Sequence, residues 1–194
     1  MKRKFFLVLM CLLCLASVTG GTLAYFTDTG TAHNVITTGA VKIAVEEWQM
    51  VEGKREPYPQ TPMAVMPGAT VSKEVCIRNQ KADSYIRAAV EIVLTDDLGK
   101  TVVLTQEEAN KILQINMNSV SWQREPEESR WWYYRQPVQQ GEATEPLFTE
   151  VVFSGRGMDN AYQNSTLEVR VFAQAVQTAH NGVSAMTANG WPEA

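Results

Sequence analysis

The sequence has very few of the residues that build disulfides. Its 194 residues include only three cysteines, and two of them, Cys11 and Cys14, lie in an apolar run near the N-terminus. Cys76 is therefore alone in the rest of the chain, and no intramolecular disulfide is expected. Val75 and Ile77 flank it, which favours a small buried side chain in a strand over a reactive thiol or an intermolecular disulfide.

The sequence is equally poor in the motifs of hydrolytic and metal sites. Its two histidines, His33 and His180, do not form an HExxH pattern, which would place two imidazoles on one helix face toward a metal. No Gly-x-Ser-x-Gly nucleophile motif is present. Two acidic pairs, Glu46-Glu47 and Asp96-Asp97, could bind a cation but are more typical of a solvated edge and a turn. We therefore predict no catalytic residue, no metal ligand and no cofactor.

Beyond residue 24 the chain has no apolar stretch long enough for a transmembrane helix, and no repeat of fixed period. A composition of 45% hydrophobic and 20% charged residues is typical of a globular protein. Residues 1–24 contain three basic residues and no acid, which leaves 14 basic and 21 acidic residues and a net charge of about −7. This charge argues against nucleic acid or an anionic membrane surface as a partner.

The N-terminus has the layout of an export signal. The basic residues Lys2–Lys4 precede the apolar run Phe5–Val18, which is short for a membrane span. Small residues at positions −3 and −1 predict cleavage between Ala24 and Tyr25, after which no stable membrane anchor would remain. An uncleaved anchor and a lipoprotein signal ending at Cys14 are the alternatives.

Alternation of apolar and polar residues predicts a series of strands. The predicted strands are Val41–Val45, Val71–Ile77, Tyr85–Leu94, Leu147–Phe153 and Leu167–Ala175. The proline-rich residues 50–69 are interpreted as a loop or insertion. Thr105 and Glu108 match a capping box, which predicts a short helix near Gln106–Leu113. These elements indicate an all-β fold, an antiparallel sandwich, in which Trp131 and Trp132 pack inside rather than bind sugars.

Three stretches of the sequence resemble the TasA/CalY (camelysin-like) family of exported Gram-positive proteins. The first, GGTLAYFTDTGTAHNVITTGAVKIAV, contains a Gly-Gly-Thr-x-Ala run, an aromatic-acidic tetrad and a first strand in that order. The others are MPGATVSKEVCIRNQKADSYIRAAVEIVL and AYQNSTLEVRVFAQAVQTAHNG, and WWYYR between them resembles the family's aromatic strand. The resemblance implies a SipW-type signal peptide, removed by a SipW-type signal peptidase. It also implies a sandwich of jelly-roll type with a short helical insertion.

The resemblance further implies a secreted protein of the extracellular matrix or cell surface, a biofilm-matrix or fibre subunit. Such subunits assemble with themselves or with related matrix subunits by donor-strand complementation, in which an N-terminal segment joins a neighbour's sheet. Camelysin-like members are also classed as metallo-endopeptidases, so a peptidase is one alternative. A surface module that binds carbohydrate or a host is another.

The expected domain organisation is a signal peptide at 1–24 and a single sandwich domain at 25–194. Residues 25–36 would be a flexible N-terminal segment that mediates assembly. In this segment Tyr25, Phe26, Val35 and Ile36 are apolar anchors, and Asp28 closes the aromatic-acidic tetrad. The alternative is that the segment pairs within its own sheet.

Overall fold

A computed structural model describes residues 35–36, 41–59, 67–96, 98–124, 126, 129–156 and 165–192. The described residues all belong to one compact unit, residues 32–194, and residues 1–31 lie outside the described part. The expected signal peptide, and its cleavage site at Ala24 and Tyr25, therefore lie outside the described part. None of the helices in that part is long and apolar enough to cross a membrane.

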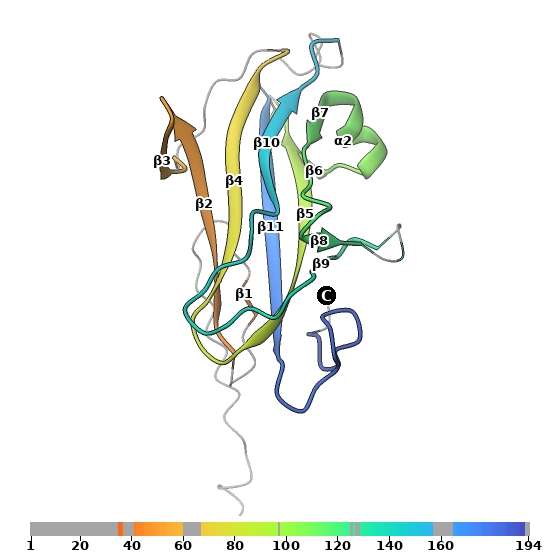
Figure 1. The fold of residues 1–194 in the computed structure, drawn as a ribbon. Helices are drawn as coiled ribbons and strands as arrows, with labels where there is room; N and C mark the ends of the chain where they lie inside the picture. The colour runs from red at the N-terminus through yellow and green to blue at the C-terminus, as the bar shows by residue number, and fades with distance from the viewer. Residues whose placement is uncertain are drawn as a thin grey trace, which may run out of the picture. The chain divides into compact units, whose positions relative to one another are not determined.

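Two sheets pack face to face across the core (Figure 1). Sheet A contains β1 (Val35–Ile36), β5 (Ser84–Thr95), β6 (Thr101–Val103), β8 (Trp122–Gln123), β9 (Trp132–Tyr134) and β11 (Thr166–Gln177). Its strand order is β1-β11-β5-β9-β8, and β6 pairs with β5 off this path. Sheet B contains β2 (Ile43–Val51), β3 (Lys54–Pro57), β4 (Thr70–Asn79), β7 (Leu113–Ile115) and β10 (Phe148–Phe153). Its order is β3-β2-β4-β10-β7.

The central pair of sheet A consists of β5 and β11, which are distant in sequence. They pair antiparallel along their whole length, from Thr166 opposite Thr95 to Gln177 opposite Ser84. Both strands were predicted from their alternation, and both extend beyond the predicted bounds. All other described strand pairs are antiparallel too, except β1 with β11. The predicted all-β sandwich is confirmed.

The predicted helix is α2 (Gln106–Ile112), a helix of about two turns between β6 and β7. The capping box is present, because the Thr105 side chain accepts from the Glu108 backbone and the Glu108 carboxylate accepts from the Thr105 backbone. This reciprocal bonding also lowers the pKa of Glu108. Ala109 and Ile112 are buried and attach the helix to the core.

The prediction for residues 41–69 is wrong in part. The first strand of sheet B begins at Ile43 rather than Val41 and continues to Val51, and β3 follows as the second arm of a hairpin. Glu52 and Gly53, with φ of 51° and 78°, form the turn. Two adjacent residues with positive φ are typical of a tight hairpin turn, and glutamate does not signal one. Pro57 is tolerated because β3 is an edge strand.

The core lies between the sheets, and its largest fully buried side chains include Trp122, Phe148 and Ile77. A second, smaller cluster covers the opposite face of sheet A. It contains Tyr85, Val176, Ala185 and Ala188, with Tyr133 and Trp191 packed against them. Residues 178–192 supply part of this cover, and we call them the strap. Sheet A is therefore covered on both faces near β5.

Candidate assembly edge

β1 lies beside only two residues of the long strand β11. Val35 registers with Ala173 and Ile36 with Gln174, and the pairing is parallel. On its other side β11 pairs with β5 over all twelve of its residues. β1 therefore covers only a small part of this edge of sheet A.

Among the described residues, Thr166–Phe172 of β11 have a strand partner on one side only. We call this stretch the β11 edge. An unpaired strand offers backbone donors and acceptors to another strand. Leu167 and Val169 are half-buried and pack against the core, whereas Ala173 farther along the same face is fully buried. A strand added here would gain backbone hydrogen bonds and would bury apolar surface.

The other terminal strands are better protected against such pairing. β3, at one end of sheet B, consists of Lys54, Arg55, Glu56 and Pro57, all exposed. Charged side chains and proline discourage pairing at a sheet edge. β6, β7 and β8, the remaining strands at sheet ends, have three, three and two residues. The β11 edge is longer than any of them and carries no proline.

The structure describes two residues of the predicted assembly segment. Val35 and Ile36 form β1 within their own sheet, as the alternative interpretation expects for these two residues. Tyr25, Phe26 and Asp28 lie outside the described residues. The role of the segment in assembly stays a prediction.

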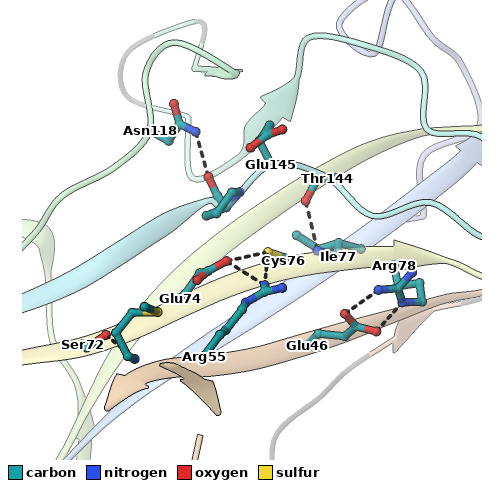
Figure 2. A network of polar contacts seen from close by, with 12 residues as sticks. Glu46, Arg55, Ser72, Glu74, Cys76, Ile77, Arg78, Asn118, Thr144 and Glu145 are labelled. Carbon is teal, nitrogen blue, oxygen red and sulfur yellow. Dashed lines mark hydrogen bonds and ion pairs between the residues drawn. The ribbon is translucent and has the colours of Figure 1, made fainter. Parts of the chain in front are cut away.

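The acidic pair Glu46-Glu47 does not form a shared cation site. Glu46 makes a bidentate ion pair with Arg78, in which Nη2 of Arg78 lies 3.1 Å from Oε2 of Glu46 (Figure 2). The Glu47 carboxylate instead lies 2.8 Å from Nζ of Lys73. Successive residues of a strand point to opposite faces, so the two carboxylates diverge.

Lys73 and Glu47 form an ion pair that the sequence analysis missed. Their side chains are only 8% and 14% exposed. The Lys73 ammonium also lies 3.9 Å from the ring centroid of Tyr58, and burial together with Glu47 raises the pKa of that phenol. One feature of the sequence could have revealed this ion pair. Lys73 lies two residues from both Val71 and Val75, so it shares their strand face, and that face points to the core.

The second acidic pair lies at the turn between β5 and β6. Asp96 Oδ1 accepts hydrogen bonds from the backbone N–H of Leu98 at 3.0 Å and of Lys100 at 2.7 Å. This confirms the turn interpretation for Asp96, because the carboxylate is used to close the turn. Asp97 lies outside the described residues.

Cys76 is buried in β4, as predicted, with 4% of its surface exposed. Its sulfur lies 3.5 Å from Nη2 of Arg55, which in turn is paired at 2.6 Å with Glu74 (Figure 2). Burial, and next the charge of Glu74, raises the pKa of the thiol to about 12. The group is therefore neutral at physiological pH, which makes it a poor nucleophile.

We expect Cys76 of the folded protein to react very slowly with iodoacetamide at pH 8, because both burial and the raised pKa suppress the thiolate. Unfolding in urea should restore the rate of an ordinary thiol. Intact mass after timed alkylation measures both rates. Equal rates in the folded and unfolded protein would contradict the prediction.

The two adjacent tryptophans are packed, as predicted. Trp131 is 8% exposed, and the guanidinium carbons of Arg87 and Arg130 lie 4.3 and 5.2 Å from its ring centroid. Trp132 is half-buried against the core, with Arg124 5.2 Å from its ring centroid. Neither ring is a free platform for a sugar.

A family model described as camelysin metallo-endopeptidase matches residues 1–182. The chain belongs to the camelysin family. The match includes every described strand and ends inside the strap, so residues 183–192 lie beyond it. No curated protein and no solved structure gives a significant match.

The family description implies a metal, which in a catalytic zinc site is held by three protein ligands. Within the described part of this camelysin-family chain, no three His, Cys, Asp or Glu side chains come together in a way that could hold a metal. His180 lies in the strap at a φ of 55°, and His33 lies outside the described residues. The described residues do not fit a metal centre.

Proposed function

We propose that this camelysin-family chain is an exported structural subunit that joins copies of itself through the β11 edge. The observation that carries the proposal is the stretch Thr166–Phe172, which has a strand partner on one side only among the described residues. Ala173 and Gln174, the two residues that follow the β11 edge, already pair with β1 as a parallel strand. An edge of this kind supports assembly by strand addition.

The proposed donor is the segment Tyr25–Ile36 of a second copy. If a neighbour supplied the β1 strand in the parallel register seen here, its residues before Val35 would run along Thr166–Phe172. The direction follows because parallel strands run the same way. Backbone hydrogen bonds would supply affinity, and alternate side chains would set the register. Removal of residues 1–24 during export would make Tyr25 the free end that inserts.

Three forms of the protein test the donor. The chain beginning at Tyr25 is expected to form filaments, seen by electron microscopy and light scattering. The same chain with an N-terminal extension should stay monomeric, because the extra residues obstruct insertion. A chain lacking Tyr25–Ile36 should also stay monomeric while its circular dichroism remains that of a folded β-protein. Equally abundant filaments from this truncated chain would contradict the proposal.

Two variants in the same strand test the acceptor. Val169→Lys places a charge on the core side of the β11 edge and should abolish filaments, because inward charges block edge pairing. Glu168→Gln is the matched control, since it removes only a half-exposed pair with Arg170 and should leave filaments unchanged. Mixing each variant with the unchanged chain separates the roles: Val169→Lys should still donate its own N-terminal segment and cap filaments.

The family description keeps a metallo-endopeptidase as the second candidate. We expect no cleavage when the purified mature chain is incubated with casein and zinc. The measurement is the appearance of casein fragments by gel electrophoresis and mass spectrometry, with and without a chelator. Chelator-sensitive cleavage that disappears in a His33→Ala, His180→Ala double variant would establish the peptidase and overturn this expectation.

A further inference from the structure

One row of residues crosses sheet A from end to end. In register from β1 to β8, its members are Ile36, Gln174, Arg87, Tyr133 and Gln123. The row begins at β1, next to the β11 edge, and ends at β8 on the opposite side of the sheet. The row therefore joins strands that lie far apart in sequence.

Arg87 and Gln174 form the centre of this row and are nearly inaccessible, at 9% and 3% exposure. Oε1 of Gln174 accepts from Nε and Nη2 of Arg87 at 2.9 and 2.6 Å. A buried guanidinium is costly unless its donors are satisfied, so this pair holds both side chains in one arrangement. Gln174 is also the β11 residue in register with Ile36 of β1.

The strap completes the surroundings of Arg87. The guanidinium lies between two indoles, 4.3 Å from the ring centroid of Trp131 and 4.7 Å from that of Trp191. The carbonyl of Pro192 accepts a further hydrogen bond from Nη2 at 3.1 Å. Cation–π contacts of this kind are strongest when they are desolvated, as here.

The strap also contacts the rest of the row. Trp191 packs edge-on against Tyr133, with ring centroids 6.0 Å apart. Gln123 donates to the sulfur of Met186 at 2.7 Å. The strap thus lies across β5, β9 and β8 and is joined to β11 through Arg87 and Gln174.

The strap holds its own shape as well. Asn181 closes it, since its side chain bonds both the backbone N–H and the carbonyl of Asn189, at 2.7 and 3.1 Å. Gly182 must lack a side chain, because a Cβ there would clash with the Thr187 carbonyl. The hydroxyl of Tyr85 donates to the Gly182 carbonyl at 2.9 Å and anchors this end on β5.

We infer that Arg87 is a positioning residue of the assembly edge, which couples the docked strap through Gln174 to the β1–β11 pairing. Docking of Trp191 holds Arg87, Arg87 holds Gln174, and Gln174 lies in register with Ile36. Loss of the strap contact loosens β1 and makes the adjoining part of β11 open more often. The consequence for assembly, a larger accessible acceptor edge, rests on the proposed function; the coupling itself does not.

Hydrogen exchange on the dilute monomeric protein tests the coupling. Trp191→Ala should raise exchange about tenfold in peptides covering Val35–Ile36 and Ala173–Gln174, because a desolvated cation–π contact is lost. Trp191→Phe keeps an aromatic face and should restore most of the protection. Arg124→Met is the matched control: it removes a cation–π contact with Trp132, which is not part of the row, so the two peptides should exchange as in the unchanged protein.

A double-variant cycle separates coupling from general loss of stability. Gln174→Met should raise exchange in the Val35–Ile36 peptide by a similar factor, and adding Trp191→Ala should raise it no further, because the connection is already broken. Unchanged exchange in Trp191→Ala, additive effects in the double variant, or an equal effect of Arg124→Met would each overturn the inference. Failure to form filaments would count against the proposed function alone, since these measurements use the monomer.

Discussion

Replacing Trp122 with alanine should lower the free energy of unfolding by about 3–5 kcal/mol, the range for removing a large aromatic side chain from a core. Trp122 is fully buried at the start of β8. Its ring centroid lies 5.0 Å from that of Tyr134, and Nε1 donates to the Glu145 carbonyl at 3.1 Å. The change therefore leaves a cavity and an unpaired carbonyl in one step. Urea denaturation followed by tryptophan fluorescence and circular dichroism measures the loss.

Two further variants test whether the loss of stability comes from the cavity left by the Trp122 side chain. Trp122→Phe retains much of the volume and should cost clearly less than the alanine variant, because the cavity is smaller. Val120→Ala, two residues earlier at 83% exposure, should change stability by less than about 0.5 kcal/mol. An alanine variant at Trp122 as stable as Val120→Ala would show that this part of the core does not form.

Lys73→Met should lower the free energy of unfolding by about 3–5 kcal/mol, because it leaves the Glu47 carboxylate, which is only 14% exposed, without its ammonium partner. The lysine is 2.8 Å from that carboxylate and 3.9 Å from the Tyr58 ring centroid, so methionine replaces the volume but not the charge. The same denaturation experiment at pH 7 gives the value.

The partner variant distinguishes a buried charge from lost packing. Lys73→Met combined with Glu47→Leu should recover most of the stability, since replacing a whole buried ion pair by apolar residues is often neutral. Lys111→Met breaks the exposed pair with Glu107, whose side chains are 62% and 85% exposed, and should cost about 1 kcal/mol or less. A double variant as unstable as Lys73→Met would refute the role given to the charge.

The elements that sequence reasoning predicted well are those with a local signal. Alternation at Tyr85–Leu94 and Leu167–Ala175 predicts the two longest strands, because a strand with a core-facing side repeats every two residues. The capping box at Thr105 and Glu108 predicts α2, because both of its hydrogen bonds lie within one turn. The burial of Cys76 follows in the same way from its place inside a strand.

The predictions failed where the local sequence signal was weak or is common to two kinds of structure. Prolines between residues 50 and 69 suggested a loop, yet Lys54–Pro57 pair with β2 as an edge strand, where proline costs little. No element was predicted after Ala175, yet the residues after Gln177 return as the strap over Tyr85. Arg87 follows Ile86 in β5 and so points to the opposite face, but nothing near it in sequence indicated that Trp191 would cover it.

By itself the sequence determined the family, the all-β character, the main strands of both sheets and the capped helix, since each depends on residues close together in the chain. Only the tertiary structure decided which charges pair, which sheet face is covered and which strand has a partner on one side only among the described residues. Those features join residues far apart, such as Arg87 with Gln174 and Pro192, 87 and 105 positions away. Periodicity predicts the strand face on which a side chain lies. Which residues contact that side chain depends on how distant strands pack.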